Sequence, residues 1–240
     1  MSDAGHSGIP PARIPTYPPQ TLKERALNYL PDPIQHLATL AKRHPRRLLI
    51  GLAGLPGSGK TTQANAWQQV FSQTCPDIPM QVLGMDGFHL SKAQLAAMPD
   101  PERAFARRGA PWTFDASGFV QKIQALQANT ATVTWPAFEH SVGDPIADAI
   151  HVPTTCQLVL VEGLYLLYRE GAWADLAGLF DEIWFLDTPL ELAQERLLAR
   201  HQAAWGISRE QAADRIARSD GKNAALVWGL RDQADWWVAA

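Results

Sequence analysis

The nine residues Gly54-Leu55-Pro56-Gly57-Ser58-Gly59-Lys60-Thr61-Thr62 decide how the rest of the chain is organised. They fit the phosphate-binding loop pattern G-x-x-x-x-G-K-[ST], whose glycines let the backbone turn so tightly that several N–H groups point at one anion. The free N–H groups and the positive dipole end of the following helix face the same phosphates. The residues that we expect to bind a nucleotide are Gly54, Pro56, Gly57, Ser58, Gly59, Lys60, Thr61 and Thr62.

Two side chains of this loop carry charge and coordination chemistry. Lys60 would place an ammonium group at the β- and γ-phosphates of ATP, and Thr61 would offer its hydroxyl to Mg²⁺. The motif requires a strand before it and a helix after it. Residues 48–53 are apolar, as in a buried parallel strand, and apolar residues recur at helical spacing over 64–71. Because both flanks are present, a glycine-rich turn in an unrelated domain is the less favoured interpretation.

The composition is that of a globular chain without a strong charge. Among 240 residues, 46% are apolar, which is ample for a core, and the net charge of −3 provides no basic field for nucleic acid. Cys75 and Cys156 lack metal or redox spacing and are typical of small buried side chains in a reducing compartment. We find no leader-like segment and no apolar run of membrane-spanning length. We therefore expect a cytoplasmic protein with neither a nucleic-acid nor a membrane partner.

The chain divides into a short leading segment and one large domain. Residues 1–21 are rich in proline and bury little, so we expect them to be mobile or extended. Residues 22–240 fit a single domain, with a helical lid at about residues 190–220. The basic run at 42–47 stands beside a predicted strand and is typical of a solvated edge.

Hydrophobic periodicity predicts strands that alternate with helices. The expected strands are 48–53, 81–85, 132–135, 158–161, 182–186 and 236–238. The expected helices are 22–44 (interrupted at Pro31 and Pro33), one after the phosphate-binding loop, 92–98, one with Asp115 as N-cap, 173–180, one begun by Thr188-Pro189, and one begun by a Ser208/Gln211 capping box. Residues 136–153 contain turn signals and predict an inserted hairpin or loop. The pattern predicts an α/β fold, in which helices cover both faces of a parallel sheet and ligands bind at the carboxyl ends of the strands.

Two carboxylates stand at such strand ends. Asp86 follows a strand that we expect to lie next to the strand of the phosphate-binding loop, where it could accept the proton of a hydroxyl that attacks the γ-phosphoryl group. A turn or cap role is the alternative for an aspartate before glycine. Glu162 ends the apolar strand 158–161 and could hold Mg²⁺ directly or through water, or it could simply face solvent.

Five segments occur in an order that resembles a known family. They are Gly54–Thr62, Met85-Asp86-Gly87-Phe88, residues 109–115 (G-A-P-W-T-F-D), Pro136-Ala137-Phe138-Glu139-His140 and Val161-Glu162-Gly163-Leu164. Together they are similar to the P-loop kinases that include uridine kinase, phosphoribulokinase and type I pantothenate kinase. The D-G-F, E-G-L and K/R-G-x-P-x-x-x-D segments are most similar to pantothenate kinase and its uncharacterised bacterial relatives. Trp112 and Phe114 stand in the block where pantothenate kinases would be expected to show tyrosines around pantothenate.

The resemblance implies a role for individual residues. It makes Asp86 the catalytic base, Glu162 an acidic residue of the metal site and His140 a residue of the substrate pocket. It also places Arg196 and Arg200 in the lid helix, where their i, i+4 spacing would let both reach the transferred phosphoryl group. The alternative is that both belong to a solvated helix face with Glu195 as a neighbour. Arg108, like its neighbour Arg107, could bind an anionic substrate or be exposed.

We therefore expect a kinase that uses ATP and Mg²⁺ to phosphorylate a hydroxyl group of a small metabolite. Pantothenate-like, nucleoside and sugar or sugar-acid substrates stay open, as does a homodimeric assembly. One alternative is a nucleotide hydrolase or ATP-gated switch without an acceptor. The other is a regulator that binds nucleotide without turnover, for which Asp86 and Glu162 would have no use.

Overall fold

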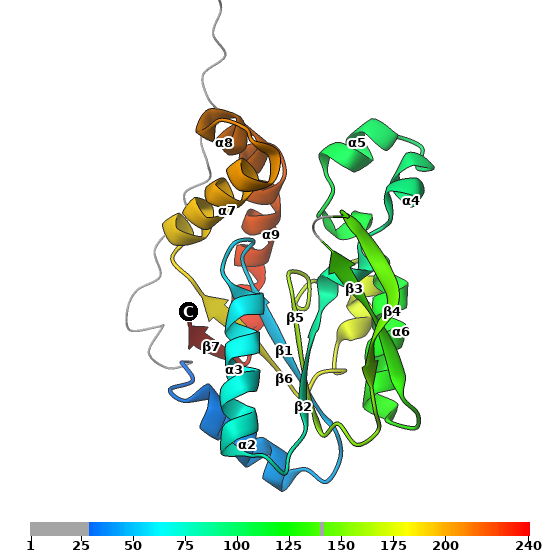
Figure 1. Ribbon diagram of the computed structural model, residues 1–240, viewed down its shortest axis with the longest axis vertical. Helices are drawn as coiled ribbons and strands as arrows, with labels where there is room; N and C mark the ends of the chain where they lie inside the picture. The colour runs from blue at the N-terminus through cyan, green and yellow to red at the C-terminus, as the bar shows by residue number, and fades with distance from the viewer. Residues whose placement is uncertain (1–28, 140–141) are drawn as a thin grey trace, which may run out of the picture.

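The computed structural model describes residues 29–139 and 142–240. The proline-rich segment, the first part of the helix predicted at 22–44, and His140 lie outside these described residues. The described residues form a parallel β-sheet flanked by α-helices, which confirms the predicted α/β fold class (Figure 1). No helix of the described residues is long and apolar enough to cross a membrane.

Five parallel strands form the central sheet. In spatial order they are β2 (Met80–Gly84), β5 (Leu158–Gly163), β1 (Leu48–Gly54), β6 (Glu182–Asp187) and β7 (Trp236–Ala239). The expectation that β2 neighbours β1 was wrong, because β5 pairs with both and lies between them. This arrangement places Glu162, at the end of β5, between the end of β1 and the segment that follows β2.

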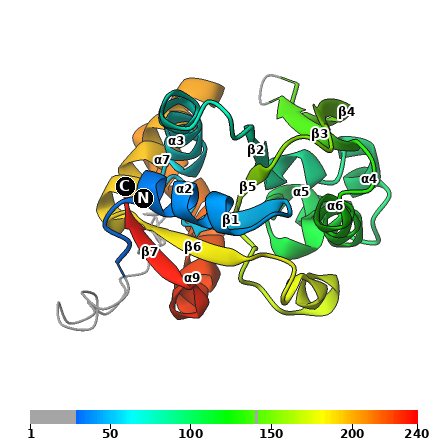
Figure 2. The same cartoon turned by 90° about the horizontal axis from the view of Figure 1, so that it is seen from below.

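The sheet is apolar on both faces because helices cover both. The flanking helices are α2 (Pro33–Arg43), α3 (Lys60–Thr74), α6 (Ala116–Ala128) and α9 (Asp220–Leu230). Leu48, Ile50 and Leu52 of β1 pack in one hydrophobic cluster with α2 and α3, whereas Leu49 and Ala53 pack in another with α6 and α9. Figure 2 shows α3 and α9 on opposite sides of the sheet. This two-sided burial is why the strand patterns are continuous apolar runs.

An inserted region follows β2 and stands over one side of the sheet. It contains α4 (Lys92–Ala96), α5 (Pro101–Ala106) and a hairpin of β3 (Val133–Glu139) with β4 (Asp144–Val152). The hairpin prediction is confirmed, although Pro136 falls inside β3 instead of beginning the insert. Its place coincides with a register shift between Trp135 and Ala137, where a residue without an N–H group is tolerated.

Two helices before α9 occupy the predicted lid region. They are α7 (Leu190–Trp205) and α8 (Arg209–Arg218), and in Figure 1 they stand above the sheet at the upper left, across from α4 and α5 at the upper right. The Ser208/Gln211 capping box at the start of α8 is confirmed. The predicted N-cap Thr188 was wrong: α7 begins at Leu190 after Pro189, and the Thr188 hydroxyl donates to the carbonyl of Ser58 at 2.9 Å.

Two other local predictions differ from the structure only at their ends. The helix predicted to be interrupted at Pro31 and Pro33 is described from Pro33 to Arg43, where Asp32 caps it and accepts a hydrogen bond from Gln35 N. The second strand ends at Gly84, one residue before the predicted end, and Met85–Phe88 forms a 3₁₀ turn. Two predictions were wrong. The segment predicted as a helix at 173–180 is a 3₁₀ turn at Gly171–Leu176. The basic run is not wholly solvated, because Arg47 is buried and donates to three backbone carbonyls.

Candidate active site

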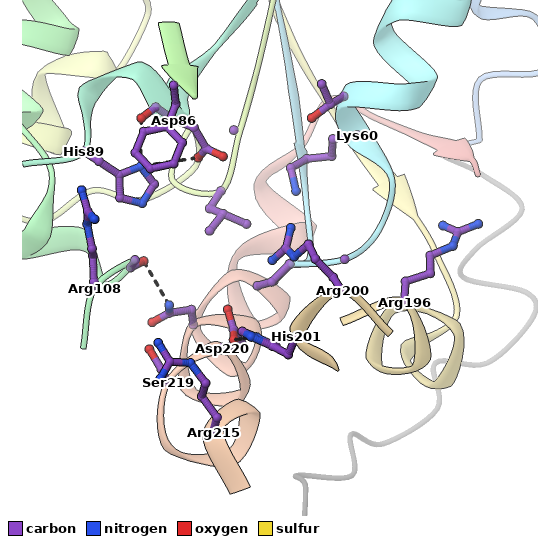
Figure 3. A pocket seen from close by; sticks show the side chains of 18 of the residues that line it. Lys60, Asp86, His89, Arg108, Arg196, Arg200, His201, Arg215, Ser219 and Asp220 are labelled. Carbon is purple, nitrogen blue, oxygen red and sulfur yellow. Dashed lines mark hydrogen bonds and ion pairs between the residues drawn. The ribbon is translucent and has the colours of Figure 1, made fainter. Parts of the chain in front are cut away.

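The predicted site residues meet at a cleft of about 460 Å³ at the carboxyl ends of the strands. Figure 3 shows Lys60 and Arg200 on one side of it and Asp86, His89 and Arg108 on the other. The lid residues His201, Arg215 and Asp220 stand between these sides. Every predicted catalytic or metal residue lines this cleft, and so does Arg108. Of the residues predicted to bind the nucleotide, Gly54 and Ser58 do not line it, and the predicted substrate residue His140 is outside the described residues.

The phosphate-binding loop holds Lys60 in a buried position. Lys60 is the first residue of α3, and its Nζ donates to the carbonyls of Gly54 at 3.1 Å and Leu55 at 2.9 Å. Burial lowers the pKa of this ammonium group, and the nearby positive charge of Arg200 adds to the effect, while Glu162 and Asp86 oppose it. The ammonium therefore lies inside the loop, and its hydrogen-bond partners among the described residues are backbone carbonyls. An anionic phosphate would complete its solvation.

Thr61 and Glu162 form a pair of oxygen groups beside the loop. The Thr61 hydroxyl, in the first turn of α3, donates to Glu162 Oε1 at the end of β5 at 2.8 Å. Glu162 is buried, and its burial raises the pKa of the carboxyl, which the charge of Lys60 partly offsets. A buried carboxylate next to an exposed hydroxyl that opens onto the cleft is an arrangement that a cation would stabilise.

Asp86 lies in the 3₁₀ turn after β2 and is exposed to the cleft. Its side chain is 45% exposed, and Oδ1 lies 4.0 Å from Nδ1 of His89. His89 Nδ1 donates to the Asp86 carbonyl at 2.8 Å, which holds the turn closed. Gly87 is required here because a Cβ atom would lie 2.2 Å from the carbonyl oxygen of Pro136 in the hairpin. The hairpin backbone thus fixes the turn that presents Asp86.

The two lid arginines differ in what they contact. Arg196 Nη1 donates to the carbonyl of Ser58 at 2.8 Å, so this guanidinium binds the phosphate-binding loop itself. Arg200 also lines the cleft, and it lies close enough to Lys60 to influence its pKa. The two side chains therefore share a helix face, but only Arg196 is tied to the loop by a hydrogen bond among those found in the described residues.

Several cleft residues were missed by the sequence analysis. His201 on α7 pairs with Asp220 at the start of α9 at 2.8 Å, and the Arg215 guanidinium lies 3.2 Å from the ring centroid of Trp205. These contacts join the lid helices to one another. His89 could have been suspected because it ends the same turn as Asp86. The His201–Asp220 pair has no local sequence signal, because its members come from separate helices.

Oxygen groups suitable for a magnesium ion are present but few. No group of three or more His, Cys, Asp or Glu side chains that could hold a metal occurs within residues 29–139 and 142–240. Thr61, Glu162 and Asp86 nevertheless supply oxygen atoms around the loop. Mg²⁺ is usually held by one or two carboxylates together with substrate phosphates and water, so this donor set fits an ion that arrives with a nucleotide.

Comparison with known proteins agrees with this geometry. A family model described as "Phosphoribulokinase / Uridine kinase family" matches residues 49–239. A Schizosaccharomyces pombe protein named "putative uridine kinase" is 36% identical over 203 residues, covering 82% of this chain and 84% of its own length. An Aspergillus versicolor "ATP-dependent kinase-like protein" is 41% identical over 145 residues, covering 58% of this chain and 84% of its own length. The crystal structure of a "putative fructose transport system kinase" from Silicibacter has a TM-score of 0.73 and 32% identity, covering 85% of this chain and 98% of its own.

Proposed function

The chain belongs to the phosphoribulokinase/uridine kinase family of small-molecule P-loop kinases, and we propose that it transfers the γ-phosphoryl group of ATP to a hydroxyl group of a small metabolite through the cleft described above. The observation that carries this proposal is that Lys60 and the exposed carboxylate of Asp86 line opposite sides of one cleft. A nucleotide on the loop and a hydroxyl at Asp86 would share that space. The names of two relatives refer to uridine and to fructose transport, and both compounds carry hydroxyl groups.

Each residue would act on a stated atom or charge. The loop N–H groups and Lys60 would bind the β- and γ-phosphates, and Arg196 would hold the loop in shape through the Ser58 carbonyl. Asp86 would accept the proton of the acceptor hydroxyl while the hydroxyl oxygen forms a bond to the γ-phosphorus. The bond from that phosphorus to the β–γ bridging oxygen breaks, and ADP leaves. Arg200 would neutralise charge on the transferred group.

Mg²⁺ would be held by Thr61 and Glu162 with the nucleotide phosphates. When bound, it would neutralise charge on the β- and γ-oxygens. The raised pKa of Glu162 belongs to the cleft without this ion, and a bound cation would favour the ionised carboxylate.

One experiment tests the proposal directly. The purified protein is incubated with ATP, Mg²⁺ and a panel of nucleosides, sugars, sugar acids and pantothenate, and mass spectrometry follows the gain of one phosphoryl group. We expect at least one compound to gain it and to accelerate the consumption of ATP. ATP consumption that no compound accelerates would instead support the hydrolase alternative. Binding of ATP without any turnover would support the regulator.

A further inference from the structure

Residues that follow β2 in the chain build the side of the cleft opposite the phosphate-binding loop, and we call this side the acceptor end. It is formed by Asp86, His89, Arg108 and Phe138, of which the first three are labelled in Figure 3. The acceptor hydroxyl would lie here if Asp86 is the base. The charges and surfaces of the acceptor end therefore bear on the chemical class of the acceptor.

Arg108 is the arginine of the acceptor end, and its charge is already paired. Nη2 donates to Asp144 Oδ1 at 3.1 Å and to the carbonyl of Leu90 at 3.0 Å. Nη1 donates to the carbonyl of Gly143 at 2.6 Å, and Nε is buried out of reach of solvent, without a hydrogen-bond partner among the described residues. Arg108 therefore fastens the hairpin turn to the loop after the Asp86 turn. A guanidinium engaged in this way offers little to a substrate carboxylate, which would have to displace Asp144.

The neighbouring Arg107 is directed away from the cleft. Its guanidinium donates to the carbonyls of Arg218 at 2.7 Å and Ser219 at 3.2 Å, and to Asn223 Oδ1 at 3.1 Å. Arg107 thus provides hydrogen-bond donors to the backbone carbonyls at the end of α8, and it does not line the cleft. Both arginines that could have bound an anionic substrate thus serve protein contacts.

The other charges of the cleft are divided between its two ends. Among the lining residues that the structure describes, the remaining lysine and arginines are Lys60, Arg196 and Arg200 at the loop and Arg215 against Trp205. The carboxylates of Asp86 and Glu162 face the same space. A bound nucleotide would occupy the cations at the loop. An acceptor with its own negative charge would then meet the carboxylate of Asp86, and the described residues of the acceptor end would offer it no unpaired arginine.

The acceptor end instead offers ring faces. The His89 ring lies between those of Phe114 and Phe138, with centroid distances of 4.0 and 4.8 Å. Phe138 and the 41%-exposed Phe105 both line the cleft. Ring faces of this kind suit the C–H face of a sugar or the plane of a base, while a carboxylate gains nothing from them.

We propose, on the premise of the kinase function above, that the acceptor is an uncharged polyhydroxylated compound, a sugar or a nucleoside, and not a carboxylate or a phosphate ester. Arg108 sets this preference, because its pairing with Asp144 neutralises the arginine charge that the described residues place at the acceptor end. The ring faces then bind the non-reacting part of the acceptor while its hydroxyl meets Asp86.

The test compares related acceptors of which one member is neutral and the other carries a carboxylate or a phosphate. The matched pairs are glucose with gluconate, glycerol with glycerate, fructose with fructose 6-phosphate, and pantothenol with pantothenate. Uridine is included as a neutral nucleoside. In every pair that reacts, we expect kcat/KM to favour the neutral member by about 10-fold or more. This is the factor that corresponds to a charge interaction worth one pKa unit. Preference for the charged member would overturn this inference and leave the kinase function standing. If ATP binds but no compound is phosphorylated, the kinase function itself fails, and this inference with it.

A pair of variants tests the assignment to Arg108. Asp144→Asn keeps an oxygen for Arg108 and for the Lys92 N–H, which it now accepts at 2.8 Å, but removes the neutralising charge. We expect the ratio of kcat/KM for the charged to the neutral member to rise about 10-fold. Asp148→Asn is the control, since Asp148 lies in the same strand and pairs at 3.9 Å with Lys122 outside the cleft. Equal ratios in both variants would overturn the role of Arg108, and the wild-type comparison decides the substrate class even if Asp144→Asn does not fold.

Discussion

Replacing Gly57 by alanine tests whether the phosphate-binding loop is held against the lid helix. Gly57 has φ of +77°, and a Cβ atom there would lie 2.4 Å from the carbonyl oxygen of Ala193 and 2.8 Å from Cγ of Leu197. The first of these is a backbone atom of α7, so no side-chain rotation relieves the overlap. Gly178 is a matched control, because its φ is +75° and a Cβ there would meet no described atom within 4 Å.

The magnitude follows from these two environments. An alanine in the left-handed region costs about 1–2 kcal/mol at either position. Overpacking against α7 adds about 1–3 kcal/mol at Gly57 alone. In a domain of this size 1 kcal/mol shifts the melting temperature by about 2–4 °C. We therefore expect Gly57→Ala to melt about 2–12 °C below Gly178→Ala, since the shared backbone strain cancels between them.

The assay is thermal unfolding of both variants without nucleotide, followed by titration with ATP. Gly57→Ala should also bind ATP more weakly, because relief of the overlap displaces either the loop or α7. Gly178→Ala should bind ATP as the wild type does. Equal melting temperatures for the two variants would show that α7 does not pack against the loop as described, and the reasoning would fail.

Four further predictions concern the cleft. Lys60→Ala should abolish most phosphoryl transfer while the protein stays folded, and a folded variant with near-normal turnover would contradict the loop assignment. Asp86→Asn should bind ATP normally yet lose acceptor phosphorylation by about 10²-fold or more, the lower scale of general-base catalysis, and an equal loss of acceptor-independent hydrolysis would argue for water as the nucleophile. Arg200→Ala should lower kcat by about 10²-fold with little change in ATP affinity, whereas Arg196→Ala should weaken ATP binding because it loses the bond to the loop; identical kinetics would refute this division. Because burial raises the pKa of Glu162, a proton should compete with Mg²⁺ for this carboxyl, and acidification from about pH 8 to about pH 5 should weaken Mg-ATP binding by the wild type. Calorimetry of Glu162→Gln should show weaker binding that changes less with pH. Parallel curves for the two proteins would count against Glu162 as a ligand.

The elements predicted best are those whose signals are local. Residues 54–62 carry their own backbone chemistry, since the glycines, Lys60 and Thr61 act through turns and a helix start within a few residues. The Ser208/Gln211 capping box is equally local and was found in place. The apolar runs at 48–53 and 158–161 identified buried strands because helices cover both faces of the sheet. From these features the sequence alone determined the α/β fold of a P-loop kinase and predicted where ATP binds.

Tertiary structure alone decided the order of the strands and the partners of the charged side chains. In space β5 lies between β1 and β2, although it follows both of them in the sequence. This order depends on how the segments that connect the strands cross the sheet, and no short sequence pattern encodes that. Arg47, Arg107 and Arg108 look alike in sequence, yet one is buried, one satisfies the end of α8 and one pairs with Asp144. A guanidinium is long and satisfies whatever oxygens the fold brings within its reach. Those oxygens come from segments far away in the chain, so the use of each arginine emerged only when the segments were packed together.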